Sequence, residues 1–188
     1  LMKTLHLKLY SLIAVVLLSV SAVFAYQTLA FDFPIGAGNW HVAYHQTIGN
    51  ETIVQYVPSG ESYEHWSKTL IIHSYRYPRQ NSAAGLLRTV TGQLETLNSY
   101  SKYVYLRATV DDAIATRCVV SNAKMKAQCD IYRAMTSFNG FITMQYINRS
   151  QENFKSNYMN WLEAIRNAKP YQAAFRNDRY MSKDNFEL

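Results

Sequence analysis

The alternation of hydrophobic and polar residues predicts β-strands over much of the chain. Residues 39–48 place Trp40, Val42 and Tyr44 on one alternation and small or polar side chains on the other, which is the two-residue period of a strand. Similar patterns or short apolar runs predict further strands at residues 52–57, 69–75, 103–110, 114–120, 128–136 and 141–147. Turn residues such as Asn139-Gly140 separate several of these runs. The pattern therefore favours a largely antiparallel sheet built from hairpins.

Two longer stretches have the spacing of helices instead. Residues 83–98 repeat apolar side chains every three or four positions after a cap at Asn81 or Ser82. Residues 151–168 form a second apolar stripe that contains Trp161, which we expect to anchor the core. Strands and two main helices together predict an α+β fold.

The segment at residues 56–66 joins two of the predicted strands. Pro58 ends the first strand, and Ser59-Gly60 supplies the turn. Ser62 is suited to cap a short helical turn that presents Tyr63 and Trp66 on one side. We expect Trp66 to be a second large anchor in the core.

The N-terminal 25 residues predict a secretory signal. Lys3 and Lys8 make a positively charged start, and the apolar run at residues 9–24 follows them. Small residues allow cleavage after Ala25 or, at a second site, after Ala30. A membrane anchor is the alternative, but the apolar run is shorter than the roughly 18 residues that span a bilayer. We therefore expect a periplasmic or extracellular protein with no membrane span after cleavage.

Composition narrows the functional classes further. Without residues 1–25 the chain keeps 17 Lys and Arg against 13 Asp and Glu, a net charge of +4 compared with +6 for the whole chain. These charges are scattered, so nucleic-acid binding has little support. The length predicts one domain at residues 26–170, expected to be a monomer, followed by a loosely docked tail at residues 171–188.

Two cysteines, Cys118 and Cys129, flank the polar turn at residues 121–124. An even number of cysteines in an exported chain predicts a disulfide, here across a hairpin. Their spacing is no redox motif, and two ligands make no zinc site.

The remaining histidines predict no metal site. His41 and His45 would share one face of a strand about 13 Å apart, too far for one ion. His65 and His73 would meet only if the chain between them folds back. The sequence carries no serine-hydrolase, zinc-protease or phosphate-loop motif, so we expect no cofactor.

One cluster offers a choice of functions. Glu61 and Glu64 beside His65 would suit an acid–base pair of a small secreted hydrolase, but two carboxylates also stabilise the start of a helix. We favour a non-enzymatic binding or accessory protein, with Tyr63, Glu64 and His65 as the contact patch and no catalytic residue assigned. Its ligand, a protein or a small molecule, is unknown.

Three segments carry a resemblance to small secreted proteins of Legionella-like gram-negative bacteria. They are the Tyr-Val-Pro-x-Gly-Glu segment ending at Trp66, the pair Tyr132-Arg133, and the Trp-Leu-x-x-Ile helix from Trp161 to Pro170. The resemblance implies an exported protein, including the option of a type II secreted effector. The element order is also similar to the PsbP/Mog1-like α/β/α sandwich, whose members are mostly binding or assembly factors and offer no catalytic residues to transfer.

Overall fold

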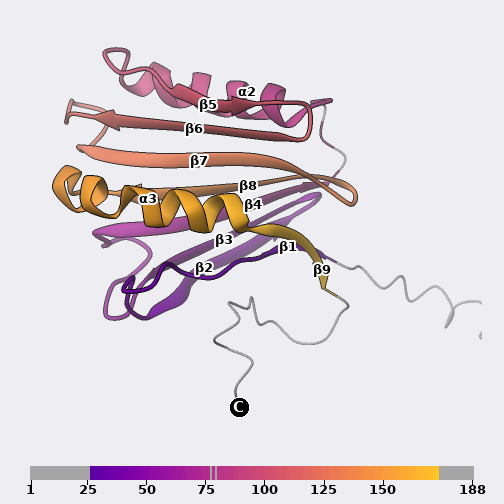
Figure 1. Cartoon of the computed structure of the whole chain (residues 1–188), viewed down its shortest axis with the longest axis horizontal. Helices are drawn as coiled ribbons and strands as arrows, with labels where there is room; N and C mark the ends of the chain where they lie inside the picture. Colours follow the sequence, from indigo (N-terminus) through magenta and orange to yellow (C-terminus); the bar gives the residue numbers. More distant parts are fainter. Residues whose placement is uncertain (1–25, 77, 79, 174–188) are drawn as a thin grey trace, which may run out of the picture.

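The computed structural model describes residues 26–76, 78 and 80–173 (Figure 1). Its centre is a seven-stranded antiparallel sheet in the order β2-β3-β4-β8-β7-β6-β5. The expected signal sequence and residues 174–188 of the expected tail lie outside the described residues. The strands are β2 (Trp40–Ile48), β3 (Glu51–Pro58), β4 (Lys68–Arg76), β5 (Val104–Ala108), β6 (Asp112–Val119), β7 (Gln128–Ser137) and β8 (Gly140–Asn148).

Two helices, α2 (Ala83–Leu97) and α3 (Gln151–Asn167), pack on opposite faces of this sheet. Alternate residues of β7 show the two sides: Ile131 and Met135 join the core cluster of α3, whereas Tyr132 and Ala134 join that of α2. The predicted α+β fold is therefore confirmed. Neither described helix is long and apolar enough to cross a membrane.

The α3 face has a second cover that the sequence did not predict. β1 (Tyr26–Ala30) pairs antiparallel with β9 (Lys169–Ala173), and the arm after β1 packs Phe33 against Trp40 and Trp161. Trp161 is 3% exposed, as expected of a core anchor. Of the expected tail, residues 171–173 belong to β9 and pair with β1.

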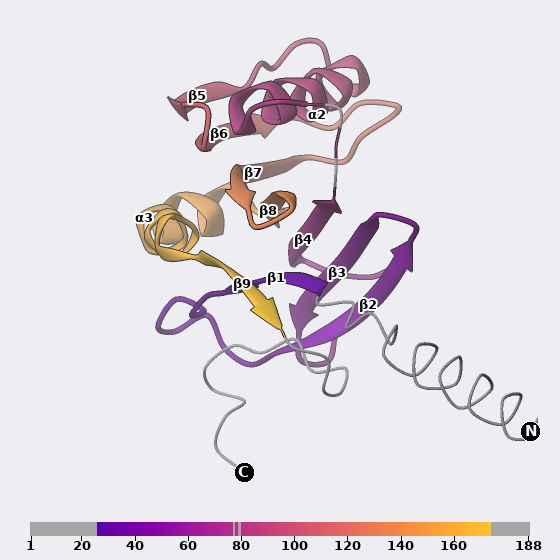
Figure 2. The same ribbon diagram turned by 90° about the vertical axis from the view of Figure 1, so that its right-hand side faces the viewer.

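The opposite face is covered over only part of its width. α2 buries Leu86 and Leu87 against β6 and β7, and Figure 2 shows it beside β5 and β6, at the far end of the sheet from β2. The side of β2, β3 and β4 that points away from α3 carries half-buried Ile53 and Ile71. We call this side the open face; by register it presents Tyr44, Gln46, Ile53, Gln55, Ile71 and His73.

The loop between β3 and β4 differs from the expectation. Ser62 and His65 close a turn through two backbone hydrogen bonds, and no helix forms there. Trp66 is half-buried and belongs to neither core cluster. The Arg149 guanidinium lies 3.9 Å from the centre of its ring and donates to its carbonyl oxygen. Trp66 therefore fixes the loop to the end of β8, because a cation over an indole is itself favourable.

The cysteine hairpin is as predicted. Cys118 and Cys129 are directly opposite in β6 and β7, with Cα atoms 4.0 Å apart, and form a disulfide. The bond fixes the register of a hairpin whose loop, residues 120–127, contains no glycine.

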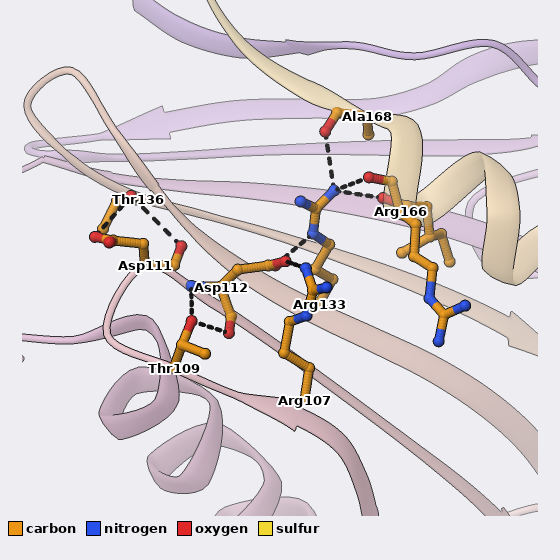
Figure 3. A network of polar contacts seen from close by, with 9 residues as sticks. Arg107, Thr109, Asp111, Asp112, Arg133, Thr136, Arg166 and Ala168 are labelled. Carbon is orange, nitrogen blue, oxygen red and sulfur yellow. Dashed lines mark hydrogen bonds and ion pairs between the residues drawn. The ribbon is translucent and has the colours of Figure 1, made fainter.

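A buried arginine attaches the end of α3 to the sheet (Figure 3). The Arg133 side chain donates from Nη1 to the carbonyl oxygens of Ile165, Arg166 and Ala168, at 2.6, 3.1 and 2.9 Å. Its Nε donates to Asp112 at 2.7 Å. The last carbonyls of a helix lack intrahelical partners and carry its negative pole, so a buried cation suits this position.

We expect replacement of both cysteines, Cys118→Ala with Cys129→Ala, to lower the free energy of unfolding by about 3 kcal/mol, because the unfolded chain gains the freedom of the opened loop. The circular dichroism spectrum should be unchanged, since both core clusters remain. Urea unfolding of the variant and of reduced wild type should agree. Two free thiols in the denatured, unreduced wild type would contradict the bond.

We expect Arg133→Lys to lower the free energy of unfolding by about 2–4 kcal/mol, because one ammonium group cannot serve both the Asp112 carboxylate and three carbonyls in a buried site. Arg166→Ala is the matched control, because the Arg166 side chain is exposed on the last turn of α3. This change should alter the free energy of unfolding by less than about 0.5 kcal/mol. Equal urea midpoints for the two variants would refute the role of Arg133.

Candidate functional site

The predicted contact patch lies at the tip of the β3–β4 loop. Glu64 and His65 are exposed, and Tyr63 is 47% exposed. The Tyr63 ring stacks on Tyr44 of the open face, with centroids 4.6 Å apart. The patch is thus accessible, and its Tyr63 ring contacts the open face through Tyr44.

The arrangement does not bring the hydrolase residues together. The Glu61 carboxylate accepts hydrogen bonds from the backbone N–H of Ser67 at 2.7 Å and from its hydroxyl at 2.5 Å. Within the described residues, no hydrogen bond or ion pair joins Glu61 or Glu64 to His65. Glu61 closes the loop, which is a structural role.

The structure instead presents a cleft of about 550 Å³ between α2 and the ends of β3 and β4. Its volume falls within the range of small-molecule sites, roughly 300–1,000 Å³. Both polar and apolar side chains line it. Its lining residues are Asn50, Glu51, His73, Tyr75, Arg76, Pro78, Gln80, Leu86, Thr89, Val90 and Gln93.

A histidine and a carboxylate meet in this cleft. His73 Nε2 lies 3.2 Å from Glu51 Oε2, and the His73 ring stacks on Tyr75 with centroids 3.9 Å apart. Burial lowers the pKa of His73, although the charge and hydrogen bond of Glu51 oppose this shift. The imidazole is therefore mainly neutral at pH 7 and donates its N–H to Glu51.

The charges of the cleft cancel at neutral pH. Glu51 supplies one negative charge and Arg76 one positive charge, while His73 stays neutral. The Arg76 side chain also donates to the carbonyl of Gly49 at 3.1 Å, which orients it at the β2–β3 turn. The cleft therefore offers many hydrogen-bonding groups and no net charge.

The open face continues the cleft towards Tyr63. From His73 the register leads through Ile53 to Gln46, and the next row places Gln55 between Ile71 and Tyr44. Gln55 is 6% exposed, and in the part of the chain described its side chain makes no hydrogen bond that we observe. Its amide is on the open face and is not among the buried groups without a hydrogen-bond partner in the described residues, so solvent reaches it there.

A second polar cluster lies under α2 and is enclosed. The Asp130 carboxylate accepts from the Tyr103 hydroxyl at 2.8 Å and from the Gln145 amide at 3.2 Å. Burial raises the pKa of Asp130 to about 6, while Tyr103, Arg117 and Gln145 act in the opposite direction. Arg117 lies over the Tyr103 ring at 4.4 Å. These contacts connect the segment just before β5 with β6, β7 and β8, so we assign the cluster a structural role.

The other predicted histidines take no part in the cleft. His41 and His45 are exposed on β2, and His65 lies in the β3–β4 loop. Among the described residues, no three His, Cys, Asp or Glu side chains gather as a metal site would require. Sequence reasoning missed the His73–Glu51 pair because its partners are 22 residues apart; only the pairing of β3 with β4 could have indicated it.

A protein-family model matches residues 35–176, which is more than half of the chain. No curated protein and no solved structure matches the chain.

We expect the stability contribution of Asp130 to depend on pH. Its pKa of about 6 exceeds the unfolded value of 3.8, so between about pH 4 and pH 6 the folded state binds more protons than the unfolded state. The free energy of unfolding should therefore fall as pH rises through this window, by up to roughly 3 kcal/mol. Asp130→Asn should flatten this slope in urea unfolding. The exposed Asp111→Asn is the control, and an identical slope in Asp130→Asn would contradict the assignment.

Proposed function

Since the chain belongs to the family whose model matches residues 35–176, we propose a function from the site itself: an exported, non-enzymatic binding protein. Its ligand is a small molecule or chain segment held in the cleft between α2 and β4. The matched region contains the whole seven-stranded sheet and both helices.

The observation that carries this proposal is the cleft beside the open face. A ligand site is concave, partly apolar and supplied with a few converging polar groups. The cleft has these properties, with Leu86, Val90 and Pro78 beside Glu51 and His73. The contacts of His73 and Glu51 with each other hold both side chains in place before a ligand arrives, which lowers the entropy cost of binding.

Export is supported by the sequence and by the disulfide. The cysteine bond suits an oxidising compartment, the periplasm or the exterior. Cleavage after Ala25 would leave β1 complete, whereas cleavage after Ala30 would remove it and expose β9. We therefore propose Ala25 as the last residue removed.

The hydrolase alternative has less support. Glu61 is occupied by Ser67, and Glu64 and His65 are exposed at a loop tip. The His73–Glu51 pair has the form of a general base and its orienting group. However, the two cysteines are bonded to each other, and the Thr89 hydroxyl that lines the cleft donates to the carbonyl oxygen of Gly85 at 3.0 Å and not to His73. We therefore favour binding.

A screen by nuclear magnetic resonance tests this function. The mature chain, labelled with nitrogen-15, is mixed with a panel of neutral sugars, amino acids, nucleotides and short peptides. We expect at least one class to shift the amide signals of Glu51, His73 and Gln93, since these residues line the cleft. His73→Ala should weaken that binding about tenfold, whereas His45→Ala, an exposed histidine on β2, should not.

Two results would contradict the proposal. Shifts confined to surfaces away from the cleft would place the site elsewhere. Turnover of a ligand that disappears in His73→Ala and in Glu51→Gln would show an enzyme.

A further inference from the structure

We infer that the cleft and the open face form one continuous site for a neutral, hydroxyl-rich chain, an oligosaccharide. This inference rests on the proposed binding function and adds the class of ligand. It depends on three features of the described residues: the cancelled charge of the cleft, the kind of polar groups that line it, and the aromatic pair at the far side of the open face.

The charge of the cleft favours an uncharged ligand. Glu51 and Arg76 cancel, and no other lining residue carries a full charge at neutral pH. An anion would meet the Glu51 carboxylate, and a cation would meet the Arg76 guanidinium. Either would lose part of its hydration without a net opposite charge to replace it.

The polar groups of the cleft match hydroxyl groups. A sugar hydroxyl donates one hydrogen bond and accepts others, so it needs donors and acceptors side by side. The amides of Asn50, Gln80 and Gln93 each supply both, and Thr89 adds a hydroxyl. The carbon-bound hydrogens of a sugar ring need an apolar surface beside these groups. Pro78, Val90 and Tyr75 provide one.

The open face extends the site beyond the length of one sugar ring. In register, His73 of β4 is level with Gln46 of β2, two strands away, and Tyr44 lies two residues from Gln46 along β2. Strand spacing and rise together give a separation of about 12 Å between His73 and Tyr44. There Tyr44 and Tyr63 form a stacked pair with Tyr63 half exposed. A single ring in the cleft cannot touch this pair, but a chain of rings can.

Gln55 lies along this path and adds a polar group to it. The residue is 6% exposed and points to the open face. Its amide is not among the buried side-chain groups that lack a hydrogen-bond partner in the described residues, so the amide is reached by solvent. A ligand hydroxyl can therefore replace water as the partner of this amide, on the strip between the cleft and the tyrosine pair.

Calorimetric titration with two neutral series tests the inference: β-1,4-linked N-acetylglucosamine and α-1,4-linked glucose, each from monomer to tetramer. For at least one series we expect affinity to rise with chain length. In Tyr63→Ala this rise should shrink about tenfold while binding of the monomer stays unchanged, because Tyr63 contacts only the distant rings. Gln93→Ala should weaken binding of every member. Tyr100→Ala, a tyrosine 92% exposed in the α2–β5 connection, is the matched control.

The outcomes separate this inference from the proposed function. If neither series binds while amino acids, nucleotides or peptides shift the signals of the cleft, the binding function stands and the oligosaccharide is refuted. If sugars bind with equal affinity at every length, or Tyr63→Ala behaves as Tyr100→Ala does, the extension across the open face is refuted. Thermal unfolding of each variant, compared with wild type, verifies that the folds are equivalent.

Discussion

The sheet is much wider than a helix, and this difference determines how its two faces are covered. Seven strands at the usual spacing of about 4.8 Å make a sheet roughly 29 Å across, whereas one helix covers about 10 Å. One helix per face therefore leaves a large part of each face to other covers. On one face β1, β9 and the arm with Phe33 supply that cover. On the other face α2 is the only helix among the described residues, and β2–β4 stay open there.

Burial along the strands follows this division. In β3 and β4 the side chains that point towards α3, such as Val54 and Leu70, are buried, while Ile53 and Ile71 on the other side are only half-buried. In β8 residues on both sides are buried. The cleft lies at the boundary, where the cover of α2 ends over β4. Such a boundary leaves a hollow with apolar residues of the core edge beside polar residues of the surface, which is the composition of a ligand site.

Local patterns predicted the elements, and non-local pairing determined the site. The strand and helix periods, the cap at Ser82 and the disulfide all depend on neighbouring residues, and the structure confirms them. The pairing of β4 with β8 joins segments more than 60 residues apart, and no local pattern encodes it. The same limit applies to Trp66, which contacts Arg149, 83 residues away in the chain, and lies outside the core that the local pattern predicted for it. The sequence contains His73 and Glu51, but no local pattern predicts that their side chains are in contact.

Two buried charges on β7 explain why the covers lie where they do. Asp130 and Arg133 are three residues apart, so strand alternation sends them to opposite faces and they cannot neutralise each other. Each face must then supply its own partners. Arg133 contacts Asp112 and the carbonyl end of α3, and Asp130 contacts Tyr103 from the segment just before β5. β3 has no buried charge that would need such a partner. The buried polar residue on its open face, Gln55, is neutral, so its amide can hydrogen-bond to solvent or to a ligand. The contacts of the two buried charges thus hold α3 and the segment before β5 against the strands β6–β8, whereas β2–β4, which have no buried charge, keep one face open.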